Sequence, residues 1–453
     1  MRIAKWWDDP YFEVPRPSSR DGGATDRGPL WHAVSPRWGH SMHTMCSYHG
    51  MFPARLAHFF IQSFSAHGDL VFDPFSGRGT AVLQARVEGR DALGNDLNPL
   101  AFVLSRAKAR PPKWPRLLSY LDNLEADYSR STSTLEDVSP DVAMLFDQET
   151  LRQLLFLRNF LMAKPWSKWS DNDFFLAGCV AGVLHGAHRS DGSSAYLSIS
   201  MPNTFSMSPT YVKNYIKEKR LKPPRVSVFE IVKDKAARLF LDGPGKPNGV
   251  VHFNDAVALM RNRDAIRSGS VRLLLTSPPY LKVVNYGTAN WIRLWWLGTD
   301  EVGRQRGRGR LILDRRLDHQ HTLDSYKDFM LRVFRGTRRV LRRDGIAVFV
   351  IGDVTQPDRP TIQLATRLWE AVGEQTGLVL LDTVEDRLQP QNKVSRIWGD
   401  TKGQATDCDR ILILGRADGP QSIEWRTVDW DEPYRDAGPD AAHARLRSKR
   451  ALR

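Results

Sequence analysis

Residues 276–280, Thr-Ser-Pro-Pro-Tyr, combine hydroxyl groups, two prolines and an aromatic ring directly after an apolar run. Two consecutive prolines exclude helix and remove two backbone donors, so the direction of the backbone is fixed here. The Ser277 hydroxyl oxygen and the Pro278 carbonyl oxygen can then accept hydrogen bonds from an amine at little entropic cost. The Tyr280 ring offers a flat face to a planar ligand. With Pro279 as the second rigid residue, the stretch predicts a corner that orients an amino group on a planar ring.

A second stretch, Asp-Pro-Phe-Ser-Gly-Arg-Gly-Thr at residues 73–80, has the residue types of a cofactor-binding turn. It follows an apolar segment that predicts the end of a buried strand, and Gly77 and Gly79 predict a tight turn that opens a helix. A Cβ at these glycines would keep a ligand away from the backbone. Asp96 ends the next predicted strand about 17 residues after Gly79, where doubly wound folds place a carboxylate for ribose hydroxyls. The set predicts an adenosine-containing cofactor.

Other ligands fit these patterns less well. Val82 stands where the third glycine of a nicotinamide-dinucleotide fingerprint belongs, which disfavours NAD. The alternative interpretation is an ordinary strand-to-helix turn that binds no ligand. His185 and His188 are three residues apart with no third ligand near them in the sequence, so we expect a core or interface role and no metal site. The three cysteines are far apart and predict neither zinc nor a disulfide framework.

The elements that must position these residues follow an alternating pattern. Residues 41–110 read as helix, strand, helix and strand, and strand–helix alternation resumes over residues 251–415. Residues 111–250 read instead as helical segments followed by a polar and then a basic stretch. An α/β domain with a helical insertion is therefore expected, between an irregular N-terminal arm (1–40) and a basic C-terminal tail (416–453).

The charge of the chain favours a polyanionic partner. The formal net charge is +14 and the sequence pI is near 9.8, which raises the expectation of nucleic acid. Residues 304–310 alternate arginine with glycine and glutamine, and such a loop could order on phosphates. A solvated, disordered end is the simpler interpretation of the basic stretch that begins at His443. A further arginine cluster predicts a phosphate-facing surface: Arg338, Arg339, Arg342 and Arg343.

The composition also bears on the compartment. No apolar stretch approaches the roughly 18 residues of a membrane span, and the N-terminal residues lack the apolar core of a secretory signal. With few, scattered cysteines, a cytoplasmic location is expected.

Together, "DPFSGRGT", "GNDLNP" and "TSPPY" resemble the S-adenosylmethionine-dependent amino-methyltransferases of DNA, which modify cytosine N4 or adenine N6. The segment around "MFPARLA" is similar to the part of that family that covers the methionine moiety of the cofactor. The matches span roughly residues 41–110 and 250–415. The resemblance implies a Rossmann-like methyltransferase fold with a seven-stranded, mostly parallel sheet and a helical insertion.

The resemblance also implies roles for single residues. The catalytic corner would be Ser277, Pro278, Pro279 and Tyr280. Residues implied to bind S-adenosylmethionine are Phe52, Pro53, Asp73, Pro74, Phe75, Gly77, Gly79, Thr80, Asp96 and Asp255. Among these, the glycine motif would hold the methionine end, Asp96 the ribose, and Asp255 would lie near the adenine. No metal is implied.

The chemistry of the corner agrees with this resemblance. An exocyclic base amine is a poor nucleophile because its lone pair is delocalised into the ring. Acceptors aimed at its hydrogens help the lone pair to rehybridise toward a methyl group. The base must leave the stack of a duplex, and Tyr280 could then stack on it. Ser-Pro-Pro-Tyr modestly favours cytosine N4 over adenine N6, since one subgroup with this motif order more often has Asp at the first position.

Three functions stay open at this point. Site-specific methylation of double-stranded DNA leads, in a restriction-modification or phage-defence setting with a possible separate cognate subunit, and residues 111–250 would then recognise the target. An RNA base amino-methyltransferase is the second, although no RNA-binding appendage is recognisable. The third is a non-catalytic nucleic-acid-binding protein on a methyltransferase scaffold, which the intact motifs disfavour.

Overall fold

The chain was analysed in a computed structural model. The structure describes residues 30–35, 38–48, 50–131, 138–189, 191–201, 208–245, 249–279, 287, 290–299, 301–302, 305–306, 323–356, 359–387 and 408–431. Tyr280, most of the Arg/Gly stretch and the basic C-terminal end lie outside these residues.

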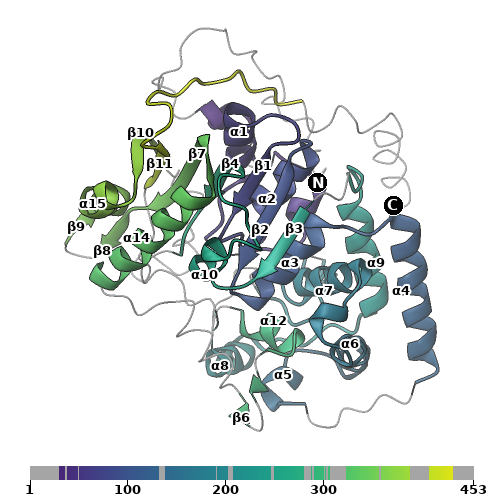
Figure 1. The fold of residues 1–453 in the computed structure, drawn as a ribbon. Helices are drawn as coiled ribbons and strands as arrows, with labels where there is room; N and C mark the ends of the chain where they lie inside the picture. The colour runs from purple at the N-terminus through teal and green to yellow at the C-terminus, as the bar shows by residue number, and fades with distance from the viewer. Residues whose placement is uncertain are drawn as a thin grey trace.

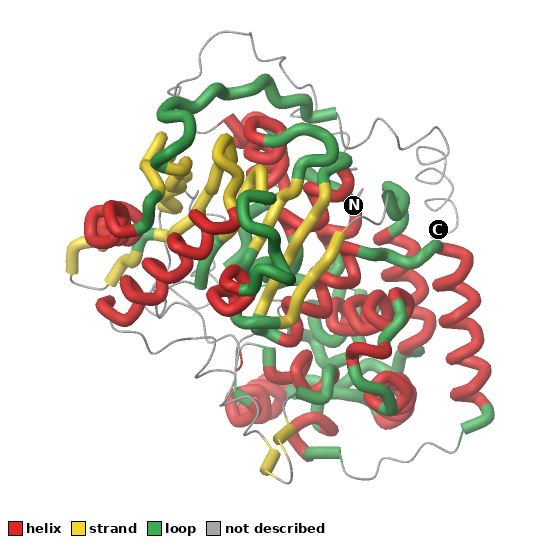
Figure 2. The backbone as a smooth tube through the Cα atoms, viewed as in Figure 1, coloured by secondary structure: helices red, strands yellow, loops and turns green. Residues whose placement is uncertain are grey.

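A seven-stranded sheet forms the centre of the fold (Figures 1 and 2). Its strands lie in the order β10, β11, β7, β4, β1, β2, β3. Their bounds are β1 Leu70–Asp73, β2 Asp91–Asp96, β3 Gly249–Phe253, β4 Val271–Thr276, β7 Leu341–Gly352, β10 Leu378–Arg387 and β11 Cys408–Arg416. The pairs β1/β2, β2/β3, β1/β4 and β4/β7 are parallel, and only β11 runs against its neighbours β7 and β10. The expected Rossmann-like methyltransferase fold with a mostly parallel seven-stranded sheet is confirmed.

Helices cover both faces of this sheet because successive residues of a strand point to opposite sides. Leu273 and Leu275 of β4 face α1 and α2, whereas Leu274 between them faces α14 and α15. The helices that flank the sheet are α1 Ala54–Phe64, α2 Thr80–Val87, α3 Pro99–Ala109, α10 Ala256–Arg261, α14 Leu323–Val340 and α15 Leu364–Val372. The predicted helix at α1 is confirmed, since Leu56, Phe59, Phe60 and Phe64 are all buried.

The segment between α3 and β3 forms a helical mass beside the sheet (Figure 1). Its helices are α4 Trp114–Ser129, α5 Pro140–Ala143, α6 Gln148–Met162, α7 Asp171–Val183, α8 Pro209–Lys219 and α9 Val228–Leu239. The sequence had indicated only two or three of these. Helix α7 is buried on almost every side and begins with a capping box between Ser170 and Asp173.

Helix α12 (Trp291–Trp296) packs into the same helical mass. All six of its residues are buried, and the Trp296 indole donates to the Ala177 carbonyl at 3.1 Å. These tryptophans therefore belong to a packing helix. Short elements complete the described chain: η2 Leu30–Ala33, η3 Ser41–Thr44, η4 Trp166–Lys168, η5 Gly373–Gln375, and the two-stranded pairs β5 Glu301–Val302 with β6 Gln305–Arg306 and β8 Val354–Gln356 with β9 Arg359–Ile362.

The four arginines of the predicted phosphate-facing cluster have partners within the chain, and a contact with phosphate stays a prediction. These arginines lie near the beginning of β7, at the sheet edge away from the motifs, and bind other parts of the chain: Arg338, Arg339, Arg342 and Arg343. Arg338 pairs with Asp418 at 3.2 Å and Arg342 with Asp69 at 3.1 Å. Asp418 and Asp69 are far away in sequence, so the local pattern could not reveal these two pairs, whereas Arg342 also pairs with the neighbouring Asp344 at 3.0 Å.

The beginning of the predicted C-terminal tail also has a structural role. Strand β11 continues to Arg416, and the following described residues lie against α1. The Trp425 ring lies 5.0 Å from that of Phe64, and the Trp430 ring lies 4.9 Å from that of His58. Residues 417–431 therefore form a packed strap, whereas the basic end from His443 lies outside the described residues.

Candidate active site

The motif residues meet at one edge of the sheet. Strands β1, β2, β3 and β4 are parallel, so their carboxyl ends share an edge, which is where open α/β sheets bind ligands. Asp73 ends β1, Asp96 ends β2, Asp255 follows β3, and Ser277 follows β4.

Asp73 joins the ends of the two central strands. Its Oδ1 accepts a hydrogen bond from the Thr276 hydroxyl at 2.6 Å and another from the Phe75 backbone N–H at 3.1 Å. The side chain is buried, and burial raises the pKa of Asp73 to about 7, with a further contribution from the charge of Asp96. No basic side chain forms an ion pair with it among the described residues. The carboxyl is therefore suited to receive a cationic group of a ligand.

The two glycines of the turn are required for different reasons. Both have positive φ, 51° at Gly77 and 78° at Gly79, which favours glycine. A Cβ at Gly79 would lie 2.9 Å from the Ser105 Cα, so this glycine lets α2 pack against α3. This packing contact is a structural reason for Gly79, and the close approach of a ligand to its backbone stays a prediction. A Cβ at Gly77 would lie 3.6 Å from the Tyr48 ring and face the cleft.

Asp96 holds the turn with both of its oxygens. Its Oδ2 accepts from the Gly77 N–H at 2.8 Å, and its Oδ1 accepts from the Asn98 N–H at 2.8 Å. Burial raises its pKa to about 6, while these backbone N–H groups oppose the rise. Each carboxylate oxygen can accept more than one hydrogen bond, so ribose hydroxyls can still be bound here.

A small cleft brings six of the predicted site residues together. The residues that line it are Tyr48, Gly50, Met51, Phe52, Asp73, Phe75, Ser76, Gly77, Arg78, Thr80 and Ser277. Pro53 lies beside it as the N-cap residue of α1. The Pro74 carbonyl accepts a hydrogen bond from the Asn95 side chain at 3.0 Å, so it supports the turn from outside the cleft. The glycine turn, the covering segment and the first residue of the corner thus share one space.

The predicted corner is described only in part. Pro278 is buried, and the Pro279 carbonyl accepts a hydrogen bond from the Tyr326 hydroxyl of α14 at 2.9 Å. Helix α14 thereby fixes the direction of the second proline. Tyr280 lies outside the described residues, so its position stays a prediction.

Asp255 lies at the same sheet edge but outside the cleft lining. It is the N-cap residue of α10, and its Oδ1 accepts from the Ala258 N–H at 2.8 Å. The Asn95 side chain donates both to the Pro74 carbonyl and to the Asn254 carbonyl, each at 3.0 Å. This amide ties the turn before Asp255 to the glycine motif, so a contact between Asp255 and the adenine stays a prediction.

The sequence analysis did not name five of the residues that line the cleft, among them Tyr48 and Arg78. The Tyr48 hydroxyl accepts from the Asn98 side chain at 2.9 Å, and the ring lies over Gly77. Arg78 donates to the His43 carbonyl at 3.0 Å and has no carboxylate partner among the described residues. Burial lowers the pKa of Arg78 to about 10, so it stays charged at neutral pH. The only available signal for Arg78 was its position as the single cation within the turn.

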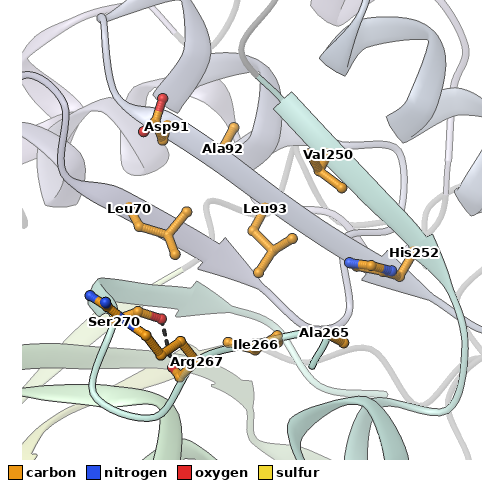
Figure 3. A pocket seen from close by; sticks show the side chains of 10 residues that line it. All are labelled: Leu70, Asp91, Ala92, Leu93, Val250, His252, Ala265, Ile266, Arg267 and Ser270. Atoms are coloured by element: carbon orange, nitrogen blue, oxygen red, sulfur yellow. Dashed lines mark hydrogen bonds between the residues drawn. The ribbon is translucent and has the colours of Figure 1, made fainter. Parts of the chain in front are cut away.

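A larger hollow lies elsewhere, on the face of the sheet (Figure 3). Its lining is Leu70, Asp91, Ala92, Leu93, Val250, His252, Ala265, Ile266, Arg267 and Ser270. It brings together none of the predicted site residues. No group of three or more metal-ligating side chains occurs anywhere in the described parts of the chain, and none of the helices described there is long and apolar enough to cross a membrane.

Comparison with known proteins agrees with the motifs. Residues 4–104 match the N6_N4_Mtase family, described as DNA methylase. The type II methyltransferase M.MvaI of Kocuria varians is 22% identical over 243 residues, which is 50% of this chain and 50% of that protein. The aligned part thus spans half the length of this relative.

Two solved structures give weaker likenesses. The rRNA methyltransferase aviRa from Streptomyces viridochromogenes is 12% identical over 83% of this chain and 90% of its own, with a TM-score of 0.29. A candidate DNA modification methylase from Thermus thermophilus is 18% identical over 37% of this chain and 52% of its own, with a TM-score of 0.21.

The sheet order, the shared cleft and the sequence matches lead to one assignment. The resemblance drawn from the glycine motif and the Ser-Pro-Pro-Tyr corner is confirmed: residues 4–104 match the N6/N4 DNA methylase family model, and the chain is similar over half its length to a type II methyltransferase.

Proposed function

We propose that the chain methylates an exocyclic base amine in double-stranded DNA, with cytosine N4 favoured over adenine N6. The observation that carries the proposal is the shared cleft, in which Ser277 lies together with Asp73 and Gly77. A corner built to hold an amine therefore opens onto the turn that is expected to hold the methyl donor.

The described residues fit S-adenosylmethionine as the donor. In the part of the chain that the structure describes, the Asp73 carboxyl has no basic partner and the Arg78 guanidinium has no acidic partner, and both line one cleft. The methionine part of the cofactor carries one ammonium and one carboxylate, so these two side chains have matching charges. Asp96 has lone pairs left for ribose hydroxyls. We therefore assign the methionine end to the turn and the ribose to Asp96.

S-adenosylmethionine supplies a methyl group on a sulfonium, whose carbon–sulfur bond breaks with its electron pair remaining on sulfur. The Ser277 hydroxyl oxygen and the Pro278 carbonyl oxygen accept the two amine hydrogens and orient the nitrogen lone pair toward the cleft. After methylation the nitrogen loses one proton, which goes to solvent water. The hydrogen bond from Tyr326 to the Pro279 carbonyl keeps the corner rigid during this step.

The base has to reach the corner from outside the stack. Chemistry on a paired base needs extrusion of the nucleotide or a single strand. We assign Tyr280 as the ring on which the extruded base stacks, and the helical segment within residues 111–250 as the part that recognises the surrounding sequence. A separate nuclease subunit would complete a restriction-modification or defence system.

Transfer of a tritiated methyl group tests the proposal. Wild-type chain with labelled S-adenosylmethionine should label unmodified plasmid DNA, and total RNA in a parallel reaction should stay unlabelled. Ser277→Ala should reduce the rate by about 100-fold, the effect of removing one well-placed polar contact in an active site, and should retain affinity for S-adenosylhomocysteine. Labelling of RNA alone would favour the RNA enzyme, and absence of any labelling would favour a non-catalytic binding protein.

A further inference from the structure

Helix α8 presents an unusual surface within the helical segment. The Ser208 side chain caps its first turn, and Pro209 occupies a first-turn position that needs no backbone donor. Val212 is its only fully buried residue, while Tyr215 and Ile216 pack partly against the neighbouring core. The remaining surface of the helix faces solvent.

Lysine and arginine dominate that exposed surface. Lys213, Lys217 and Arg220 are exposed and follow one another at intervals of four and three residues, so they share one side of the helix. Lys222 and Arg225 extend the basic surface into the following segment, and both are exposed. Among the described residues none of these five forms an ion pair, and the one pair on the helix joins Lys219 to Glu218.

Two other lysines of the helical segment are neutralised within the protein. Lys233 pairs with Asp122 at 2.5 Å and Glu125 at 2.6 Å, and Lys164 pairs with Asp173 at 2.7 Å. The concentration of unpaired charge on α8 is thus not a general property of this segment. Unpaired cations on one side of a helix are complementary to a polyanion.

The exposed surface of α8 between these cations and the tyrosines carries further side chains that can contact nucleotides. Asn214 is exposed, and the Tyr211 ring is 47% exposed and lies nearly parallel to that of Tyr215 at an interplanar angle of 17°. An amide can donate to and accept from base edges, and a tyrosine can contact sugars, phosphates and bases.

The packing holds α8 in a fixed relation to the catalytic corner. Helix α12 follows the corner in sequence and lies in the same hydrophobic core as α8. The Arg158 side chain of α6 donates to the Trp295 carbonyl at 2.8 Å, and the Arg293 side chain reaches the Ser47 hydroxyl at 3.1 Å. The core therefore connects the surface of α8 both to the chain beyond Ser277 and to the segment that covers the cleft.

We infer that the exposed side of α8 binds duplex DNA beside the base that is modified. Lys213, Lys217 and Arg220 contact backbone phosphates, and Tyr211 and Asn214 face the groove. This inference rests on the proposed function, because it takes the substrate to be duplex DNA, but it assigns the contact to one helix.

Salt-dependent binding of a 30-base-pair duplex tests the inference. The logarithm of the association constant falls with the logarithm of salt concentration by about 0.9 for each phosphate contact. In the triple variant Lys213→Gln, Lys217→Gln, Arg220→Gln three contacts are removed, so the magnitude of this slope should fall by about 2 to 3. The KM of the variant for plasmid DNA should rise about 10-fold or more. Its affinity for S-adenosylhomocysteine should equal that of the wild type, which also shows that the variant is folded.

A matched control removes the same charge elsewhere. Arg116, Arg261 and Arg332 are exposed on α4, α10 and α14, and their triple replacement by Gln should leave the slope nearly unchanged. Equal slopes for wild type and the α8 variant, or equal losses in both triple variants, would overturn the inference. A wild-type chain that binds S-adenosylhomocysteine but no duplex DNA would instead overturn the proposed function.

Tyr211→Ala separates groove contact from phosphate contact. We expect an unchanged salt slope, because no charge is removed, together with a several-fold higher KM for plasmid DNA. Full retention of the wild-type KM would remove Tyr211 from the contact surface.

Discussion

Two side chains of opposite charge, Asp73 and Arg78, line the cleft at the carboxyl edge of the sheet without partners of opposite charge among the described residues. Burying a charge without a partner is costly, so a ligand group of opposite charge would stabilise each of these side chains. The arrangement explains why a guanidinium is tolerated in a turn otherwise built from small residues. It also allows the cofactor assignment to be tested without measuring catalysis.

Replacement of Arg78 tests the contact with the cofactor carboxylate. Arg78→Gln should weaken S-adenosylhomocysteine binding by about 10-fold or more, since a hydrogen bond to a charged group contributes about 1.5–3 kcal/mol. Binding of 5′-methylthioadenosine, which lacks the amino-acid part, should not change. Isothermal calorimetry measures both affinities, with Arg116→Gln as the control. Equal losses for the two ligands would show that Arg78 only supports the fold of the turn.

The protonation of Asp73 predicts a pH dependence of cofactor binding. Its pKa in the free protein is raised to about 7, and a ligand ammonium beside it would lower that pKa. Binding should then release protons near pH 7, and the affinity for S-adenosylhomocysteine should rise from pH 6 to pH 8. Calorimetry at pH 7 in two buffers of different ionisation enthalpy measures the proton release. Asp73→Asn should abolish most of it, and an unchanged proton count in that variant would contradict the assignment.

At the scale of elements, the strand–turn–helix unit from β1 to α2 depends on how closely α2 approaches α3. The structure explains Gly79 by the contact with Ser105, whereas the sequence pattern suggested ligand approach. Local patterns correctly predicted the order of strands and helices around the cleft, because hydrophobic periodicity and glycine positions are local signals. The packing neighbours of those elements are not local, and here the sequence was less informative.

Gly79→Ala measures this packing contact. The substitution places a Cβ 2.9 Å from the Ser105 Cα and at a φ of 78°, and should lower the free energy of unfolding by about 2–4 kcal/mol. Gly192→Ala is the matched control, since Gly192 has a φ of 82° but nothing within 4 Å of an added Cβ. It should cost only the backbone strain, about 1 kcal/mol. Equal losses in chemical denaturation would show that the contact with Ser105 is unimportant.

At the scale of the whole molecule, long-range contacts join parts that the sequence presents separately. The strap at residues 417–431 packs on α1 through Trp425, and the Trp31 indole of the N-terminal region donates to Asp386 of β10 at 3.0 Å. Neither contact has a local signature, which is why these regions were expected to be an arm and a tail. The candidate site was easier to predict, because its residues lie at strand ends whose sharing of one edge follows from the parallel order.

Long-range contacts also connect the candidate site to the basic helix α8. Helix α12 anchors the chain beyond the corner in the helical segment that presents α8. The candidate cleft, the corner and the basic surface are therefore parts of one packed unit. A duplex bound on α8 could be held while a single base is inserted into the site, without large movement between the two.

Modification-sensitive sequencing of DNA from a host that expresses the chain tests the central claim most directly. We predict methyl groups on one exocyclic base amine, cytosine N4 by preference, within one defined sequence context. They should be absent from cells that express Ser277→Ala at the same level. Host DNA without such methylation, or equal methylation with the Ser277→Ala variant, would contradict the account.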